Sequence, residues 1–261
     1  MSLRLDPYDL TDIGMDCVER VLERSKDLQE LKVDISALQE LNQQNKLARL
    51  LRGQSKRLTA LSLEGDSAHE WIPKAAELCP ARCDLPILRG FCLSCPKPFK
   101  VPHPFVQWIV SMVSPWSRVS ALMPYAQWFA TQPSPMTLDN VEELFQDTYF
   151  PPLLEIAEMW MPLMDVYLKG LEFEPEDWKR IIAALDLSTL ETLNLSNSNF
   201  SQEQLTTLIE LIPQGTNPVR RLKLHLYHTD LVICPSTITL LRKLAEKAPH
   251  IEIDIYNPCD S

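Results

Sequence analysis

The segment Leu190-Glu191-Thr192-Leu193-Asn194-Leu195 decides the fold, because it places leucines in the pattern Leu-x-x-Leu-x-Leu. Side chains along a β-strand point alternately to its two faces, so Leu193 and Leu195 share one face. Similar aliphatic patterns begin at Leu28, Leu58, Leu85, Leu163, Val219 and Ala248. Successive patterns start 27 to 30 residues apart, except for one gap of 78 residues after Leu85. This spacing indicates an internal repeat.

A helical pattern follows the strand pattern in several repeats. Leu205, Leu208 and Ile209 lie three or four residues apart, which is typical of one face of an α-helix, and Ser201 is a candidate N-cap. One strand and one helix cannot bury their apolar faces alone, whereas stacked repeats share a core. The predicted parallel strands centre near Leu5, Val33, Leu63, Leu88, Val119, Leu168, Leu195, Leu224 and Ile253.

The repeat resembles that of the leucine-rich-repeat family, of the ribonuclease-inhibitor-like type, most strongly over residues 190–200. The resemblance covers residues 1–95 and 163–261. It implies an α/β fold, a right-handed horseshoe-shaped solenoid with a parallel inner sheet and helices on the convex face. The ninth repeat position departs from the Asn or Cys usual in the family. In the predicted register it holds Ser36, Asp66, Leu93, Leu171, Ser198, Tyr227 and Tyr256.

We expect a single solenoid over residues 1–261, with regular repeats at 1–95 and 163–261 and an irregular stretch at 96–162. This stretch is rich in Pro and contains Trp108, Trp116, Trp128 and Trp160. We expect a helix from Pro104, and the aromatic residues fill a widened repeat core in the favoured interpretation. In the alternative, a loop presents Tyr125, Trp128 and Phe129 to a partner.

Both the start of the chain and its composition suggest what kind of protein this is. Leu3 and Leu5 fit the fourth and sixth repeat positions, so we expect an N-terminus truncated within a repeat. A net charge of −10 argues against nucleic acid as a partner. The sequence contains no apolar run long enough to span a membrane. Seven cysteines without an apolar leader indicate an intracellular protein of the cytoplasm or nucleus.

The sequence lacks the common catalytic motifs, among them the zinc-protease pair, the nucleophile elbow and the phosphate-binding loop. Cys79, Cys83, Cys92 and Cys95 are spaced like zinc ligands, but the predicted strand between the two pairs separates them. Core packing of these cysteines is therefore favoured, and structural zinc is the alternative. We predict no catalytic residue, no metal and no cofactor.

The predicted register places the fifth and seventh residues of each repeat on the concave face of the sheet. The fifth positions are Arg4, Lys32, Ser62, Arg89, Tyr167, Asn194, Lys223 and Glu252, and the seventh are Asp6, Asp34, Glu64, Phe91, Lys169, Ser196, His225 and Asp254. The early repeats set a basic row beside an acidic row, which we expect to pair across strands. The predicted protein-binding residues are Tyr167, Lys169, Asn194, Arg221, Lys223 and His225. An acidic segment of another protein would fit them, and a solvated face without a partner is the alternative.

These observations favour a non-enzymatic protein–protein interaction module. The degenerate repeats also resemble those of divergent fungal F-box/leucine-rich-repeat proteins. That resemblance implies the substrate-recognition part of a ubiquitin-ligase adaptor, which would contact a cullin-RING scaffold through a missing upstream region. Two alternatives stay open. One is a degenerate structural remnant of a repeat protein, and the other is an enzyme whose site forms only in three dimensions.

Overall fold

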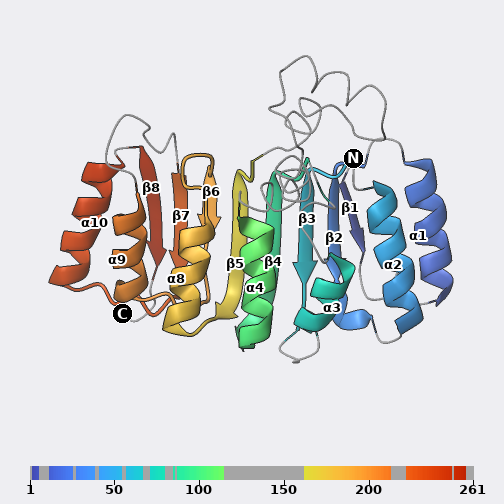
Figure 1. Ribbon diagram of the computed structural model, residues 1–261, viewed down its shortest axis with the longest axis horizontal. Helices are drawn as coiled ribbons and strands as arrows, with labels where there is room; N and C mark the ends of the chain where they lie inside the picture. Colours follow the sequence, from blue (N-terminus) through green and yellow to red (C-terminus); the bar gives the residue numbers. More distant parts are fainter. Residues whose placement is uncertain are drawn as a thin grey trace, which may run out of the picture.

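A computed structural model describes residues 2–5, 12–25, 28–38, 41–54, 57–66, 71–79, 85, 87–114, 162–212, 222–248 and 250–256. These residues form an α/β fold with a single sheet of eight parallel strands (Figure 1). The strands follow one another across the sheet in chain order. They are β1 (Ser2–Leu5), β2 (Glu30–Asp34), β3 (Ala60–Glu64), β4 (Gly90–Lys100), β5 (Asp165–Glu172), β6 (Thr192–Asn194), β7 (Leu222–Tyr227) and β8 (Ile251–Tyr256). The predictions of an α/β fold and a parallel sheet are confirmed.

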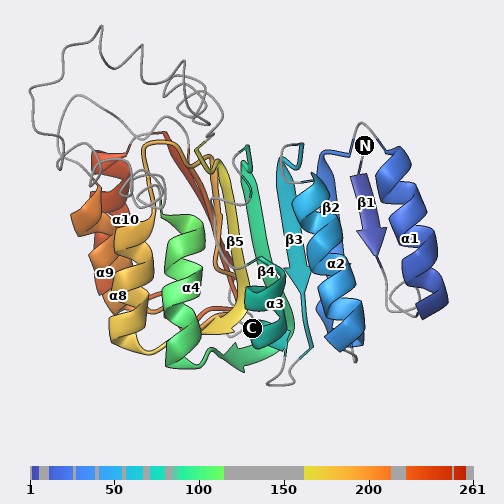
Figure 2. The ribbon, with the colours of Figure 1, turned by 45° about the vertical axis from the view of Figure 1, so that its right-hand side comes forward.

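The helices between the strands form one row, in which each packs on the next. They are α1 (Asp12–Arg24), α2 (Leu41–Gln54), α3 (Trp71–Leu78), α4 (His103–Val113), α8 (Pro175–Ala184), α9 (Gln202–Leu211) and α10 (Pro235–Lys247), and a short 3-10 helix, η2 (Ile35–Ala37), follows β2. Figures 1 and 2 show this row along one face of the sheet. We call the other face, which none of these helices covers, the helix-free face. None of the described helices has the length and apolar character required to cross a bilayer.

Alternation along each strand builds the core. Leu193 and Leu195, which the sequence predicts to share a face, are at most 1% exposed. The predicted stripe on α9 is also buried, and the Ser201 side chain caps this helix. Gln204 Oε1 accepts a hydrogen bond from Ser201 N, which completes a capping box. Strand and helix therefore bury their apolar sides against each other, as the repeat pattern requires.

The predicted register of β4 is wrong by three residues. Phe91, not Leu88, aligns with Leu61 of β3, and Leu93 aligns with Leu63. Because side chains alternate with a period of two, an odd slip exchanges the two faces. Phe91 is fully buried instead of pointing outward, and Cys92 lies on the helix-free face.

The predicted register of β7 is wrong by two residues. Leu224 aligns with Leu193 of β6, where the sequence predicts Leu222. An even slip leaves each side chain on its predicted face. Lys223 and His225 therefore stay on the helix-free face, and Tyr227 joins them. The same slip extends to β8, where Ile253 aligns with Leu224.

The irregular stretch at 96–162 begins inside regular structure, because β4 continues to Lys100 and α4 follows it. The helix predicted from Pro104 is confirmed, and its Ile109 and Met112 are buried. β4 pairs directly with β5, so the prediction that a strand near Val119 extends the sheet between them is wrong. Residues 115–161, which include Tyr125, Trp128 and Phe129, lie outside the described residues.

Candidate functional site

One row of side chains crosses all eight strands on the helix-free face. Strand pairing joins its members in order, and we call it the central row: Arg4, Lys32, Ser62, Cys92, Tyr167, Asn194, His225 and Asp254. A second row lies two residues further along β2 to β5, and we call it the rim row: Asp34, Glu64, Ser94 and Lys169. Five of the six residues that the sequence predicts for binding lie on this face. They are Tyr167, Lys169, Asn194, Lys223 and His225, and Arg221 lies outside the described residues.

The expected cross-strand pairing of charges is confirmed between β2 and β3. The Lys32 Nζ atom lies 2.5 Å from Glu64 Oε1, and both side chains are only partly exposed. An exposed ion pair of this kind adds little to stability. It does neutralise the two charges on this part of the face.

The basic side chains near β8 also have carboxylate neighbours. Lys223 Nζ lies 3.7 Å from a Glu252 carboxylate oxygen, and His225 Nδ1 lies 3.0 Å from Asp254 Oδ2. The His225 ring stacks on Tyr227, with ring centroids 5.9 Å apart. Partial burial, together with the Asp254 carboxylate, raises the pKa of Tyr227, so the phenol stays protonated at neutral pH. This end of the sheet thus presents aromatic side chains beside basic groups that already contact a carboxylate.

Lys169 differs from the other lysines of this face. Its Nζ lies 5.4 Å from the centroid of the Tyr167 ring, within the range of a cation–π contact. Its neighbour across the strand pair is Ser94, a small uncharged residue. Burial raises the pKa of Tyr167, so this phenol is also neutral. Lys169 forms no ion pair with a carboxylate within the described part of the chain, and its charge is available to a partner.

Asn194 is a buried residue of the central row that stabilises the backbone of the sheet. Its side chain is 7% exposed, and its Oδ1 accepts a hydrogen bond of 3.1 Å from Ser196 N. The amide therefore holds the turn after β6, where Asn197 adopts a positive φ of 58°. A partner that lies on the face meets Tyr167 and His225 on either side of Asn194, and Asn194 itself stabilises the backbone between them.

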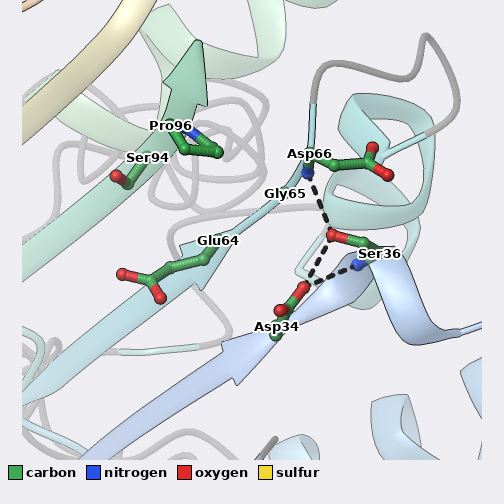
Figure 3. Close-up of a pocket in the computed structure, with 7 residues that line it drawn as sticks. All are labelled: Asp34, Ser36, Glu64, Gly65, Asp66, Ser94 and Pro96. Atoms are coloured by element: carbon green, nitrogen blue, oxygen red, sulfur yellow. Dashed lines mark hydrogen bonds between the residues drawn. The ribbon is translucent and has the colours of Figure 1, made fainter. Parts of the chain in front are cut away.

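A hollow of about 240 Å³ opens where β2 and β3 end, beside the middle of β4 (Figure 3). Its lining residues are Asp34, Ser36, Glu64, Gly65, Asp66, Ser94 and Pro96. Asp34 Oδ1 accepts hydrogen bonds from the backbone N and the Oγ of Ser36, at 3.1 and 2.6 Å. Ser36 Oγ in turn accepts from Asp66 N at 2.9 Å. These polar groups link the turns of neighbouring repeats. We therefore interpret the hollow as a structural feature of these turns.

Sequence reasoning assigned repeat positions to four lining residues of this hollow, Asp34, Ser36, Glu64 and Asp66, but did not bring them together. The available signal was that Asp34 and Glu64 each end or nearly end a predicted strand. Carboxyl ends of parallel strands meet at one edge of the sheet, where binding sites of α/β proteins commonly lie. The wrong register of β4 hid Ser94 and Pro96 from this argument.

The described cysteines do not form a metal site. Cys79 is buried against Met112, with 4.0 Å between the sulfur atoms, whereas Cys92 lies on the helix-free face. Cys95 is buried and donates to Asp66 O at 3.2 Å. Burial raises the pKa of both the Cys92 and the Cys95 thiols, which disfavours the thiolate that zinc needs. Across the described ranges no cluster of three His, Cys, Asp or Glu side chains converges, and Cys83 lies outside them.

One cysteine that the sequence did not single out has an unusual environment. Cys234 is the N-cap residue of α10. Its Sγ lies 2.9 Å from Ser236 Oγ and 3.2 Å from Thr237 Oγ1. These hydrogen bonds lower the pKa of Cys234 to about 7. The signal in the sequence was a cysteine directly before Pro235 and two hydroxyl residues, at a position where a helix begins.

The sequence was also compared with known proteins. No protein-family model matches it. No match was found among curated proteins either.

Proposed function

We propose that this chain is a non-enzymatic protein-binding module of the leucine-rich-repeat type, which holds its partner on the helix-free face. The observation that carries the proposal is the central row, which continues across eight parallel strands without a covering helix in the described part of the chain. Repeat solenoids use such extended faces for binding. The proposal therefore treats the sheet as a platform for binding another protein.

The arrangement of the elements supports a right-handed solenoid. Strand order follows chain order, whereas a doubly wound fold reverses its strand order at a switch point and has helices on both faces. Parallel strands joined through a helix cross over right-handedly in nearly all proteins. The register repeats Leu28, Leu58 and Leu88 at intervals of 30 residues, which is more regular than the sequence pattern first indicated.

Hydrogen bonds between neighbouring repeats support the same proposal. Asn199 Oδ1 accepts from Phe173 N, and Ser36 Oγ accepts from Asp66 N. In the family that this sequence resembles, an Asn or Cys at the ninth position makes such bonds to the turn backbone. Here Asn199 does so from the tenth position and Ser36 from the ninth. The departure at the ninth position thus leaves the bonding between turns in place.

The face is suited to a partner that offers aromatic packing and one anionic group. Tyr167, His225 and Tyr227 supply flat side chains, and aromatic residues are frequent among interface hot spots. Lys169 supplies a positive charge without a described carboxylate partner. An acidic segment of another protein remains the proposed partner, with its anion placed on Lys169 instead of spread over a basic patch. Arg221, and the group Tyr125, Trp128 and Phe129, stay as further candidate contacts.

The F-box resemblance extends the proposal to a ubiquitin-ligase adaptor of the cytoplasm or nucleus. In that role the helix-free face would hold the substrate, and a segment upstream would contact the cullin-RING scaffold. The test is affinity capture with the full-length protein followed by mass spectrometry. Recovery of cullin-scaffold components is the expected result, and their absence from the full-length sample would count against the adaptor role.

A narrower experiment tests the binding face itself. Wild-type chain, Lys169→Glu, Tyr227→Ala and the control Arg49→Glu are used in parallel captures from native extract. Arg49 is exposed on α2, so the control has the same sign of charge change away from the face. We expect the same proteins with wild type and control, and a loss of at least about tenfold with the face variants. Identical capture by all four proteins would overturn the proposed face.

A further inference from the structure

The last strand of the sheet leaves part of its apolar side uncovered. Leu222, Leu224 and Leu226 of β7 are 0% exposed. Their partners on β8 are Ile251, Ile253 and Ile255, and all three are only partly buried. β8 is the outer strand of the described sheet, and no strand among the described residues lies beyond its layer of isoleucine side chains.

The first strand is the other outer strand. Leu3 of β1 is partly buried and Leu5 is 2% exposed, on the side that faces the helices. Arg4 between them is exposed on the helix-free face and stands at the start of the central row. Asp254 stands at the other end of that row, with its side chain 52% exposed. The two edges therefore have the same apolar pattern and opposite charges.

We propose that β1 of a second copy of this chain pairs in parallel with β8 and continues the sheet. This inference goes beyond the proposed function. When the register of the described strands is carried on, Leu3 and Leu5 of the second copy fall beside Ile253 and Ile255. Arg4 of the second copy then falls beside Asp254, in the next place of the central row.

The charges on the two edge strands favour this head-to-tail pairing of β1 with β8 over a two-fold pairing of β8 with β8. Neighbouring strands at this end are already joined by contacts between a basic and an acidic side chain, Lys223 with Glu252 and His225 with Asp254. Arg4 of a second copy would add a further pair of the same kind. In a two-fold arrangement β8 would meet β8 in antiparallel fashion, and Glu252 would lie opposite Asp254 of the other copy. Like charges directly opposite each other destabilise a strand pair.

The terminal helices have apolar side chains on their outer flanks as well. On α1, Asp16 and Glu19 contact Lys46 of α2, and Val21, on the other flank, is 42% exposed. On α10, Lys247 donates to Ile209 O of α9, and Ile238, on the other flank, is 41% exposed. Helical geometry sets these residues on the flanks that face the two open ends. In a head-to-tail contact, Val21 of one copy and Ile238 of the other both face the junction between the copies.

The contact uses two different edges, so it does not close on itself. Each added copy offers another β8 edge, and assembly is open-ended and rises with protein concentration. The test is sedimentation velocity of the 261-residue chain over about a hundredfold range in the micromolar region. We expect the average mass to rise above that of the monomer. A monomer at every concentration would overturn the proposal.

Charge reversal makes the test specific to the two edges. Arg4→Asp alone and Asp254→Arg alone should each weaken assembly by about tenfold or more, because each sets like charges side by side. An equimolar mixture of the two variants should assemble again, since every junction then joins one acid with one base. The control Arg49→Asp on α2 should assemble like the wild type.

Melting temperatures show whether each variant is folded. Ile253→Lys blocks the same edge without touching the His225–Asp254 pair, and it should also leave a monomer. Assembly that survives Ile253→Lys would place the contact elsewhere and overturn the proposal. So would a mixture of Arg4→Asp and Asp254→Arg that remains monomeric while the wild type assembles.

Discussion

The Asn199 side chain forms hydrogen bonds with the backbone of Phe173, which lies in the preceding repeat. Its Nδ2 donates to Phe173 O at 2.8 Å, and its Oδ1 accepts from Phe173 N at 3.0 Å. Oδ1 also accepts from Trp178 Nε1 at 2.8 Å. Trp178 is 1% exposed and packs edge-on against Phe173 and Phe200. One amide thus satisfies three polar groups beside an aromatic cluster that joins two repeats.

We expect Asn199→Ala to lower the free energy of unfolding by about 2–4 kcal/mol, because Trp178 Nε1 and the Phe173 backbone lose their partners at a largely buried position. Urea denaturation with an unchanged m-value would measure the loss. Asn45→Ala, at an exposed position on α2, is the matched control and should change stability by less than about 0.5 kcal/mol. Equal effects of the two substitutions would contradict the role assigned to Asn199.

The close approach of Gly65 to Trp71 gives a second prediction. A Cβ atom on Gly65 would lie 2.2 Å from Cδ2 of the Trp71 ring, which is itself 1% exposed. Gly65→Ala should therefore cost about 1–3 kcal/mol through overpacking. Gly53, near the end of α2, has nothing within 4 Å of its added Cβ. Gly53→Ala should raise stability by about 0.5–1 kcal/mol. Thermal unfolding of both variants checks the opposite signs.

Neighbouring residues of β4 give a third prediction, which tests the register. Phe91 is fully buried and lies edge-on to Trp108, with centroids 6.3 Å apart. Phe91→Ala should cost about 3–5 kcal/mol, as for other large core deletions. Cys92→Ala on the opposite face should cost about 1 kcal/mol or less. The register predicted from Leu85 and Leu88 implies a small effect at Phe91, so denaturant titrations of the two variants distinguish the registers.

The register of β4 shows how much of the fold could be predicted from the sequence. Alternation and spacing predicted the parallel sheet and most of the strands, because the repeat averages over many leucines. Register depends on single residues, and Leu85 and Leu88 fit the Leu-x-x-Leu pattern as well as Leu88 and Phe91 do. A slip of three residues at β4 put Phe91 on the wrong face. A slip of two residues at β7 left Lys223 and His225 on the face predicted for them.

The sequence predicted where the candidate site lies on the sheet better than it predicted the interactions of its side chains. The sequence predicted that Lys223 and His225 bind a partner, but in the structure these side chains already contact the carboxylates of Glu252 and Asp254. That pairing follows from the register of β7 against β8, which the sequence pattern predicted correctly, because it placed Lys223 level with Glu252 and His225 level with Asp254. Asn194 was expected as a contact residue and is instead 7% exposed, because its amide binds the turn at Ser196. The burial of Asn194 could not be derived from its residue type and repeat position alone.

The thiol of Cys234 gives the last prediction, which concerns pH. A pKa of about 7, against an ordinary value of 9.0, means that the folded state holds the thiolate at a pH where the unfolded chain keeps the proton. Alkylation of Cys234 by iodoacetamide should therefore reach half of its maximal rate near pH 7. Cys95, whose pKa is raised by burial, should react far more slowly.

The contacts of Cys234 Sγ with the Ser236 and Thr237 hydroxyl groups are the main cause of the lowered pKa, and they supply the control. Ser236→Ala removes the contact with the largest effect, so the midpoint of the alkylation profile should move toward higher pH. The same linkage gives a sign for stability. Between about pH 7 and 9 the unfolded chain binds more protons at this site than the folded chain, so Cys234 contributes stability that grows as the pH rises. It is lost as the pH falls through 7. Cys234→Ala should flatten this part of the stability profile, and a wild-type midpoint near 9 for alkylation would contradict the assigned environment.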